Sequence, residues 1–113
     1  YNLVNDQKEI NNFFDIVIKS QKEKEIKNLI IYKKAMYNAD IASENELLDI
    51  LNPLLKSQSV WKSHALLLMA DYFEKSNNLI KSKNFLEEIV NSELVNNEIR
   101  IEAERRLKRK FGD

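Results

Sequence analysis

The chain has 113 residues, of which 43% are hydrophobic and 32% charged, with one glycine, one proline and no cysteine. Lysine plus arginine and aspartate plus glutamate each number 18, so the net charge is zero, which argues against a nucleic-acid binder that relies on bulk positive charge. One glycine is too few for the turns of a many-stranded β fold, so the composition predicts an all-α protein, and the absence of cysteine excludes disulfides and thiolate metal sites.

Two helices are predicted in the first third of the chain, over about residues 6–19 and 22–38. In the first helix, apolar residues recur three and four positions apart and therefore share one face. They are Ile10, Phe13, Phe14, Val17 and Ile18. A similar stripe in the second helix is flanked by lysines and consists of Ile26, Leu29, Ile30 and Met36.

A third helix is predicted over about residues 44–56. Ser43 followed by Glu46 is typical of a capping box, in which the two side chains bond to each other's backbone N–H groups. Pro53 lies inside the apolar pattern of this helix. Because proline lacks an N–H and its ring clashes one turn back, Pro53 must either kink the helix or restart it behind Asn52 as a cap.

Three further helices are predicted, over about residues 60–75, 79–91 and 97–110, with Ser59 as the N-cap of the first. The connecting segments are short, and none is rich in proline, glycine or serine. Short loops between helices of this length are typical of antiparallel helical hairpins. The sequence therefore predicts a single domain of about six helices over residues 1–113.

The chain resembles itself at an offset of 35 residues, which is the period expected of a repeated helical hairpin. Such hairpins stack on their neighbours because one hairpin alone cannot bury its apolar surface. The alternative is a chance match between two amphipathic helix pairs. The matched positions are Ile31 and Leu66, Ala35 and Ala70, Ile50 and Phe85, Leu51 and Leu86, Leu54 and Ile89, and Leu55 and Val90.

The segment Trp61–Val90 resembles a tetratricopeptide repeat. Asn77 stands at the position of the family's turn glycine, and asparagine is the residue other than glycine that best tolerates a left-handed backbone. The segment departs from the family at Ile89, where alanine is usual, and has no closing proline. The family's interface positions are occupied by Leu66, Met69, Ala70 and Phe73 and by Ser82, Leu86 and Ile89. The resemblance implies a right-handed α-solenoid of stacked antiparallel hairpins.

A second resemblance covers about residues 24–112. It is carried, in chain order, by LLDILNPLL, Trp61, NNLIKSKNFLEEIV and NEIRIEAERRLKRKFG. These segments are similar to the C-terminal half of the tetratricopeptide-like inner-membrane proteins of α-proteobacteria, which are related to the ancillary subunit of the bacterial Sec translocon. The resemblance implies an N-terminal membrane anchor before Tyr1 and a domain that faces the periplasm. It also implies the Sec translocon or periplasmic chaperones as partners, in secretion or envelope assembly.

The sequence offers no catalytic constellation. His64 is the only histidine, and although it can share a helix face with Asp71, no nucleophile motif accompanies the pair. Glu87 and Glu88 are adjacent and point apart on a helix, so they cannot flank one scissile bond. We therefore expect a structural or surface role for His64, and predict no enzymatic activity, no cofactor and no metal.

A groove for a protein partner is predicted on the helix over residues 60–75. In a stack of hairpins the first helix of each pair lines the inner surface. The side chains of this helix that are expected to face the groove differ in polarity and are His64, Leu67, Asp71 and Glu74. Such a surface suits an extended peptide or a partner helix. The alternative is a groove occupied by the protein's own termini or by solvent.

The last predicted helix ends in a cluster of basic residues. Arg105, Arg106 and Arg109 could contact phosphates or anionic lipid headgroups. An alternative function is therefore a cytoplasmic helical adaptor that binds nucleic acid or an anionic surface through this helix. The simpler interpretation is that cations at a helix C-terminus complement the helix dipole, an effect of about 0.3–1 kcal/mol.

Overall fold

Six α-helices connected by short loops make up the computed structural model, which describes residues 3–112. They are α1 (Leu3–Ser20), α2 (Lys24–Asn38), α3 (Glu44–Leu55), α4 (Lys62–Lys75), α5 (Leu79–Asn91) and α6 (Asn97–Phe111). The described residues contain no strand, and none of their helices is both long enough and apolar enough to cross a membrane. The prediction of an all-α chain with about six helices is confirmed.

The helix ends agree with the prediction to within three residues, and the differences have local causes. The helix predicted from residue 60 begins at Lys62, and Ser59 is not its N-cap. The Ser59 hydroxyl instead donates a hydrogen bond to Glu25 Oε1 (2.8 Å) and accepts one from the N–H of Trp61 (3.0 Å). The hydroxyl of Ser59 is therefore engaged by Glu25 of α2, and α4 begins later than predicted. The residues next to Ser59 in the sequence give no sign of this contact.

The expected capping box opens α3. The Ser43 hydroxyl accepts a hydrogen bond from the N–H of Glu46 (3.2 Å), and the Glu46 carboxylate accepts one from the N–H of Ser43 (3.1 Å). Of the two predictions for Pro53, a restart behind Asn52 is wrong, because α3 continues through Pro53 to Leu55. Pro53 is exposed and lies near the end of the helix, where few backbone hydrogen bonds remain to be lost.

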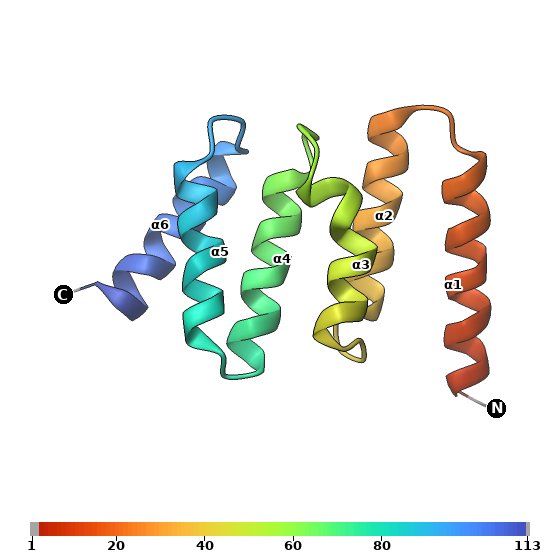
Figure 1. Cartoon of the computed structure of the whole chain (residues 1–113), viewed down its shortest axis with the longest axis horizontal. Helices are drawn as coiled ribbons and strands as arrows, with labels where there is room; N and C mark the ends of the chain where they lie inside the picture. Colours follow the sequence, from red (N-terminus) through yellow and green to blue (C-terminus); the bar gives the residue numbers. More distant parts are fainter. Residues whose placement is uncertain (1–2, 113) are drawn as a thin grey trace.

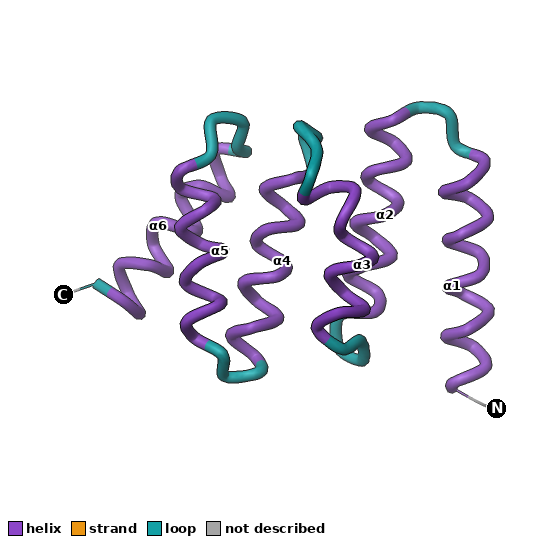
Figure 2. The backbone as a smooth tube through the Cα atoms, in the orientation of Figure 1, coloured by secondary structure: helices purple, strands orange, loops and turns teal. Residues whose placement is uncertain are grey.

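The helices form a row in which each packs against the next (Figure 1). The connecting loops lie alternately at the top and at the bottom of the row, so neighbouring helices run antiparallel (Figure 2). In addition, α4 contacts both α2 and α6, whereas no contact among the described residues joins α1 to α3 or α3 to α5. The even-numbered helices therefore approach one another more closely than the odd-numbered ones. The result is an elongated body of 48 × 32 × 20 Å.

The apolar core consists of two clusters that share α4. The first contains Ile31, Ala35, Leu47, Leu51, Leu54, Ala65, Met69 and Phe73. The second contains Leu66, Ala70, Leu86, Ile89, Ile99 and Ala103. Two partly buried side chains, Leu55 and Phe85, pack against both clusters and join them into one core.

The 35-residue match extends to burial. Each of the six matched pairs has the same degree of burial on its two members, and the buried residues of α3 map onto those of α5 at this offset. A large residue followed four positions later by a buried alanine recurs in α2, α4 and α6, where the small side chain lets helices approach closely. The three pairs are Ile31 and Ala35, Leu66 and Ala70, and Ile99 and Ala103.

The turn between α4 and α5 depends on Asn77, which has a left-handed backbone with φ 64°. The N–H of Asn78 donates to the Phe73 carbonyl (2.8 Å) and the N–H of Asn77 to the Glu74 carbonyl (3.1 Å), which is the Schellman arrangement that ends many helices. This arrangement usually has glycine at the left-handed position. The structure therefore shows that Asn77 adopts the left-handed backbone that asparagine was expected to tolerate.

Candidate interaction groove

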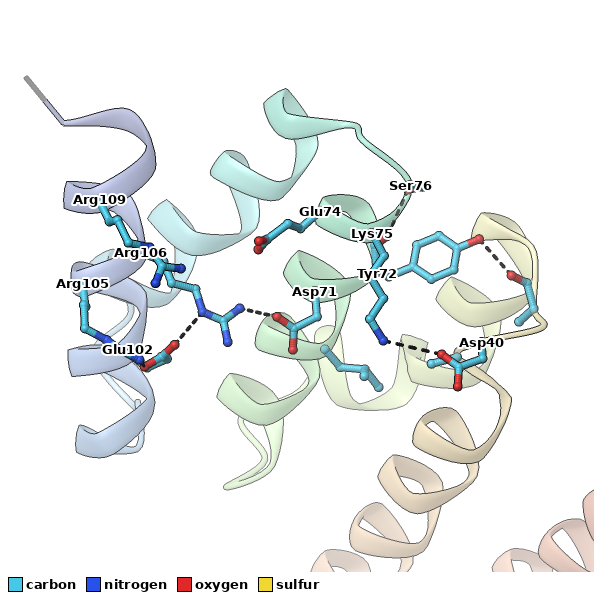
Figure 3. A pocket seen from close by; sticks show the side chains of 13 residues that line it. Asp40, Asp71, Tyr72, Glu74, Lys75, Ser76, Glu102, Arg105, Arg106 and Arg109 are labelled. Carbon is cyan, nitrogen blue, oxygen red and sulfur yellow. Dashed lines mark hydrogen bonds and ion pairs between the residues drawn. The ribbon is translucent and has the colours of Figure 1, made fainter.

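A cavity of about 720 Å³ lies on the side of the molecule where the even-numbered helices meet. We call it the inner groove. Its walls come from the turn that follows α2, from the C-terminal half of α4, and from α6 (Figure 3). It is lined by Ala39, Asp40, Ala42, Leu68, Asp71, Tyr72, Glu74, Lys75, Ser76, Glu102, Arg105, Arg106 and Arg109.

The lining of the inner groove is charged on both sides and balanced in sign. Four lining residues are acidic and four are basic. The uncharged lining residues are Ala39, Ala42, Leu68, Tyr72 and Ser76. The acidic residues are Asp40, Asp71, Glu74 and Glu102, and the basic residues are Lys75, Arg105, Arg106 and Arg109. The α6 wall carries most of the positive charge, and the α2 and α4 walls carry most of the negative charge.

Arg106 joins the two walls. Its guanidinium donates to Asp71 on α4 and, through Nε, to Glu102 Oε2 on its own helix at 2.6 Å (Figure 3). Burial alone would lower the pKa of Arg106, but the hydrogen bonds to Glu102 and Asp71 outweigh it and raise the pKa. Hydrogen bonds from Arg105 and Arg106 lower the pKa of Glu102. Both Arg106 and Glu102 are therefore held in their charged forms.

Two further ion pairs border the groove. Lys110 donates to Glu74 and thereby lowers the pKa of that carboxyl. Lys75 lies 3.6 Å from Asp40, with both side chains largely exposed. No ion pair joins Arg109 to a partner within the described part of the chain. Arg109 and the exposed face of Arg105 are consequently the cations of the groove that remain most available to a ligand.

The ion pairs across the groove follow the repeat period. Asp40, in the turn after α2, and Lys75 on α4 are 35 residues apart, as are Asp71 on α4 and Arg106 on α6, so in both pairs residues one period apart become neighbours. Tyr72 adds a neutral contact across the same wall, since its hydroxyl donates to the Ala42 carbonyl at 2.8 Å. The two walls of the groove are therefore joined both by ion pairs and by this hydrogen bond.

Two of the four predicted groove residues line the cavity. Asp71 and Glu74 do so, and the structure brings them together with Arg105, Arg106 and Arg109, which the sequence suggested as a separate anion-binding set. His64 and Leu67 lie outside the cavity. His64 is near the start of α4 and packs against the rings of Tyr32 and Trp61, which also stack on each other. Leu67 packs against the second core cluster.

Sequence reasoning missed Asp40, Leu68, Tyr72 and Glu102. The signal for Glu102 was its spacing of four residues from Arg106, which favours an ion pair on a helix. The signal for Asp40 was the opposite charge one period later, at Lys75. Among the described residues, no group of three or more histidine, aspartate or glutamate side chains is arranged to hold a metal ion. The absence of a cofactor and of enzymatic activity stays a prediction.

The corner that contains His64 is aromatic. The His64 ring centroid lies 4.8 Å from that of Trp61 and 5.6 Å from that of Tyr32. Burial lowers the pKa of His64, and its buried Nδ1 has no hydrogen-bond partner within the described residues. The neutral imidazole therefore contributes packing to this corner, as expected for a structural histidine.

Comparison with known proteins identifies no relative. No protein-family model matches the chain, and neither a curated protein nor a solved structure matches it. The functional argument therefore depends on the groove and on the pattern of helices that builds it.

Proposed function

We propose that the chain is a non-catalytic protein-interaction module, built as a tetratricopeptide-like array of stacked hairpins, whose inner groove binds a segment of a partner protein. The observation that carries the proposal is the meeting, across one groove, of side chains that lie one 35-residue period apart. In a solenoid of helical pairs, equivalent faces of successive pairs form a continuous inner surface. Closer contact among α2, α4 and α6 than among the odd-numbered helices supports this arrangement, because it curves the row toward the groove.

The groove's chemistry favours a peptide or helix of mixed charge. Among the lining residues, Leu68 and Tyr72 are partly buried and offer apolar contact, whereas the charged Asp40, Arg105 and Arg109 are exposed. Charges at a rim contribute to specificity and to the rate of association more than to affinity. A segment with acidic and basic residues around a few apolar ones matches this lining.

The experiment selects peptides that bind the chain from a displayed random library and measures their affinity for variants. Arg105→Glu combined with Arg109→Glu should weaken binding about tenfold, which corresponds to about 1.4 kcal/mol. Lys108→Glu is the matched control, since Lys108 is an exposed cation on the same helix that does not line the groove. Failure to select any peptide, or equal loss of affinity in the control, would contradict the proposal.

The resemblance to inner-membrane tetratricopeptide proteins favours a partner in secretion or envelope assembly and a membrane-anchored, periplasm-facing location. The purified Sec translocon and purified periplasmic chaperones are the probes that test this. Binding of one of them that is weakened by the Arg105 and Arg109 substitutions, but not by Lys108→Glu, supports the assignment. Binding of none of them would leave the groove with a different class of protein partner.

The alternative is a cytoplasmic adaptor that binds nucleic acid or an anionic surface through α6. Ion pairs with Asp71, Glu102 and Glu74 occupy much of the positive charge of α6. Because these carboxylates already neutralise Arg106 and Lys110, the protein-binding proposal has the stronger support. Titration of RNA or acidic vesicles at low and high salt separates the two, since phosphate binding weakens steeply with salt.

A further inference from the structure

The ion pairs between α4 and α6 leave this part of the inner groove with an excess of positive charge. Helix α6 places four cations at or beside the groove, and three carboxylates pair with cations of this set. The cations are Arg105, Arg106, Arg109 and Lys110, and the carboxylates are Asp71 and Glu74 of α4 and Glu102 of α6 itself. Within residues 3–112, Arg109 is the cation of this set that has no ion pair. One positive charge therefore remains without a counter-charge.

The excess positive charge lies near Glu74. Lys110 donates a hydrogen bond to the Glu74 carboxylate, which lowers the pKa of that carboxyl, and the positive charges of three α6 residues add to this effect, namely Lys110, Arg106 and Arg109. Arg109 extends from α6 toward α4, which carries Glu74 (Figure 3). A further carboxylate beside Arg109 would therefore be attracted, whereas a further cation would be repelled.

The carboxylates of α4 can leave these cations without loss of the fold. The side chains of Asp71 and Glu74 are 40% and 30% exposed, and ion pairs that water reaches contribute little to stability. Arg106 keeps Glu102 as a partner when Asp71 is released. Helix α6 is also held by apolar side chains that belong to the second core cluster or pack against it, namely Ile99, Ala103, Leu107 and Phe111. A carboxylate from a ligand can therefore take the place of Asp71 or Glu74.

We infer that the partner segment bound in the inner groove is acidic, and that its carboxylates bind Arg109 and displace the carboxylates of α4 from Arg106 and Lys110. The inference rests on the proposed function and narrows the segment of mixed charge to one in which acidic residues outnumber basic ones. Asp71 and Glu74 are then internal competitors, because they pair with the same cations in the free protein. The exchange of one carboxylate for another leaves neither cation unpaired, which avoids the cost of a desolvated charge without a partner.

Selection of peptides from a displayed random library tests the chemistry of the partner. Peptides selected on the parent should contain more aspartate and glutamate than lysine and arginine, and a short oligoglutamate should displace them, whereas an oligolysine should not. Selected peptides without an acidic excess would overturn the inference and leave the proposed function standing, whereas failure to select any peptide would overturn both. A single-stranded RNA that displaces the peptides at a lower concentration than an oligoglutamate of equal length would assign these cations to nucleic acid and overturn the inference.

Removal of the two internal carboxylates tests the competition. Asp71→Asn combined with Glu74→Gln should raise the affinity for the selected peptides about threefold or more, because α4 no longer occupies the cations of α6. Glu87→Gln combined with Glu88→Gln is the matched control, since it removes the same two charges from exposed residues of α5 that do not line the groove, and it should change the affinity little. Unchanged or weaker binding by the first variant, or an equal gain in the control, would overturn the inference.

A second variant tests the same binding without removing an ion pair. Arg109→Gln should weaken the binding of the selected peptides severalfold, because it removes the cation that has no internal partner. Lys108→Gln changes the preceding residue, an exposed cation that does not line the groove, and should bind like the parent. Circular dichroism checks that both variants keep their helices. Equal affinity of the Arg109→Gln variant and the parent would show that the partner's carboxylates do not bind Arg109.

Discussion

His64 occupies an aromatic corner in which its charged form is disfavoured. It is the only histidine in the chain, and burial against Tyr32 and Trp61 lowers its pKa. Because the folded state binds this proton less tightly than the unfolded state, acidification favours unfolding in the window below the ordinary histidine pKa. Carboxylates contribute little to this window, since their pKa values lie lower.

We therefore expect the melting temperature of the parent to fall between about pH 7 and pH 5. His64→Gln keeps a polar side chain but cannot gain the proton, so its melting temperature should change less over the same range. Thermal unfolding followed by the fluorescence of Trp61, the only tryptophan, measures both. An equal pH dependence in parent and variant would contradict the assignment to His64.

At the scale of elements, Glu25 fastens the start of α2 to the loop before α4. Its carboxylate accepts hydrogen bonds from the Val60 N–H (2.9 Å), Asn28 Nδ2 (2.9 Å) and the Ser59 hydroxyl (2.8 Å). The bonds from Val60, Asn28 and Ser59, in that order, lower the pKa of Glu25. A group whose pKa is lowered in the folded state stabilises it above the ordinary pKa, and this contribution is lost as the pH falls through the folded pKa.

Glu25→Gln should accordingly lower the melting temperature at neutral pH by more than it does at acid pH, because the contribution of the charged carboxylate is lost as the pH falls through its lowered folded pKa. Differential scanning calorimetry at the two pH values measures the difference. Glu23→Gln, on an exposed residue two positions earlier, is the control and should have little effect at either pH. A loss that is the same at both pH values would show that the charge of Glu25 is unimportant.

Helices and caps were predictable because their causes are local. The apolar spacing and the pair Ser43 and Glu46 specify α3 from nearby residues alone, and Asn77 supplies the left-handed turn. The start of α4 was not predictable from local sequence, because Glu25, more than 30 residues away, binds Ser59. Local reasoning fails where a distant side chain competes for a capping group.

The candidate site was half predictable for a related reason. The predicted inner face of the helix over residues 60–75 included Asp71 and Glu74, and the basic cluster near the end of the chain included Arg106. Neither observation indicated that these residues would lie next to one another. The repeat period contained that information, since Asp71 and Arg106 are separated by one period. His64, which the same reasoning selected, lies near the start of α4 beside Trp61 and Tyr32 and does not line the cavity.

At the scale of the whole molecule, Phe73 and Trp61 differ in burial, although both are large aromatic residues in or next to α4. Phe73 is 2% exposed and its ring stacks on Phe85 of α5 at 5.7 Å, whereas Trp61 is only partly buried. Phe73→Ala should cost about 3–5 kcal/mol, a large share of the stability of a small domain, and Trp61→Ala should cost less.

Urea unfolding of the two variants, followed by circular dichroism, compares them with the parent. Phe13→Ala, which truncates a largely exposed phenylalanine, is the control and should change the free energy of unfolding little. A Phe73→Ala variant that unfolds at the same urea concentration as the parent would refute the assignment of Phe73 to the core.

The sharing of α4 between the two apolar clusters has a consequence for how the protein denatures. In a long repeat array, units at the ends can fray while those in the middle persist, because each unit depends only on its immediate neighbours. Here the central helix serves both halves, and Leu55 and Phe85 touch both clusters. If the helices on one side of α4 unfold, the apolar residues that α4 buries against them become exposed to solvent. We therefore expect the helices from α2 to α6 to unfold as one cooperative unit, although apolar positions in their sequence recur at an offset of 35 residues.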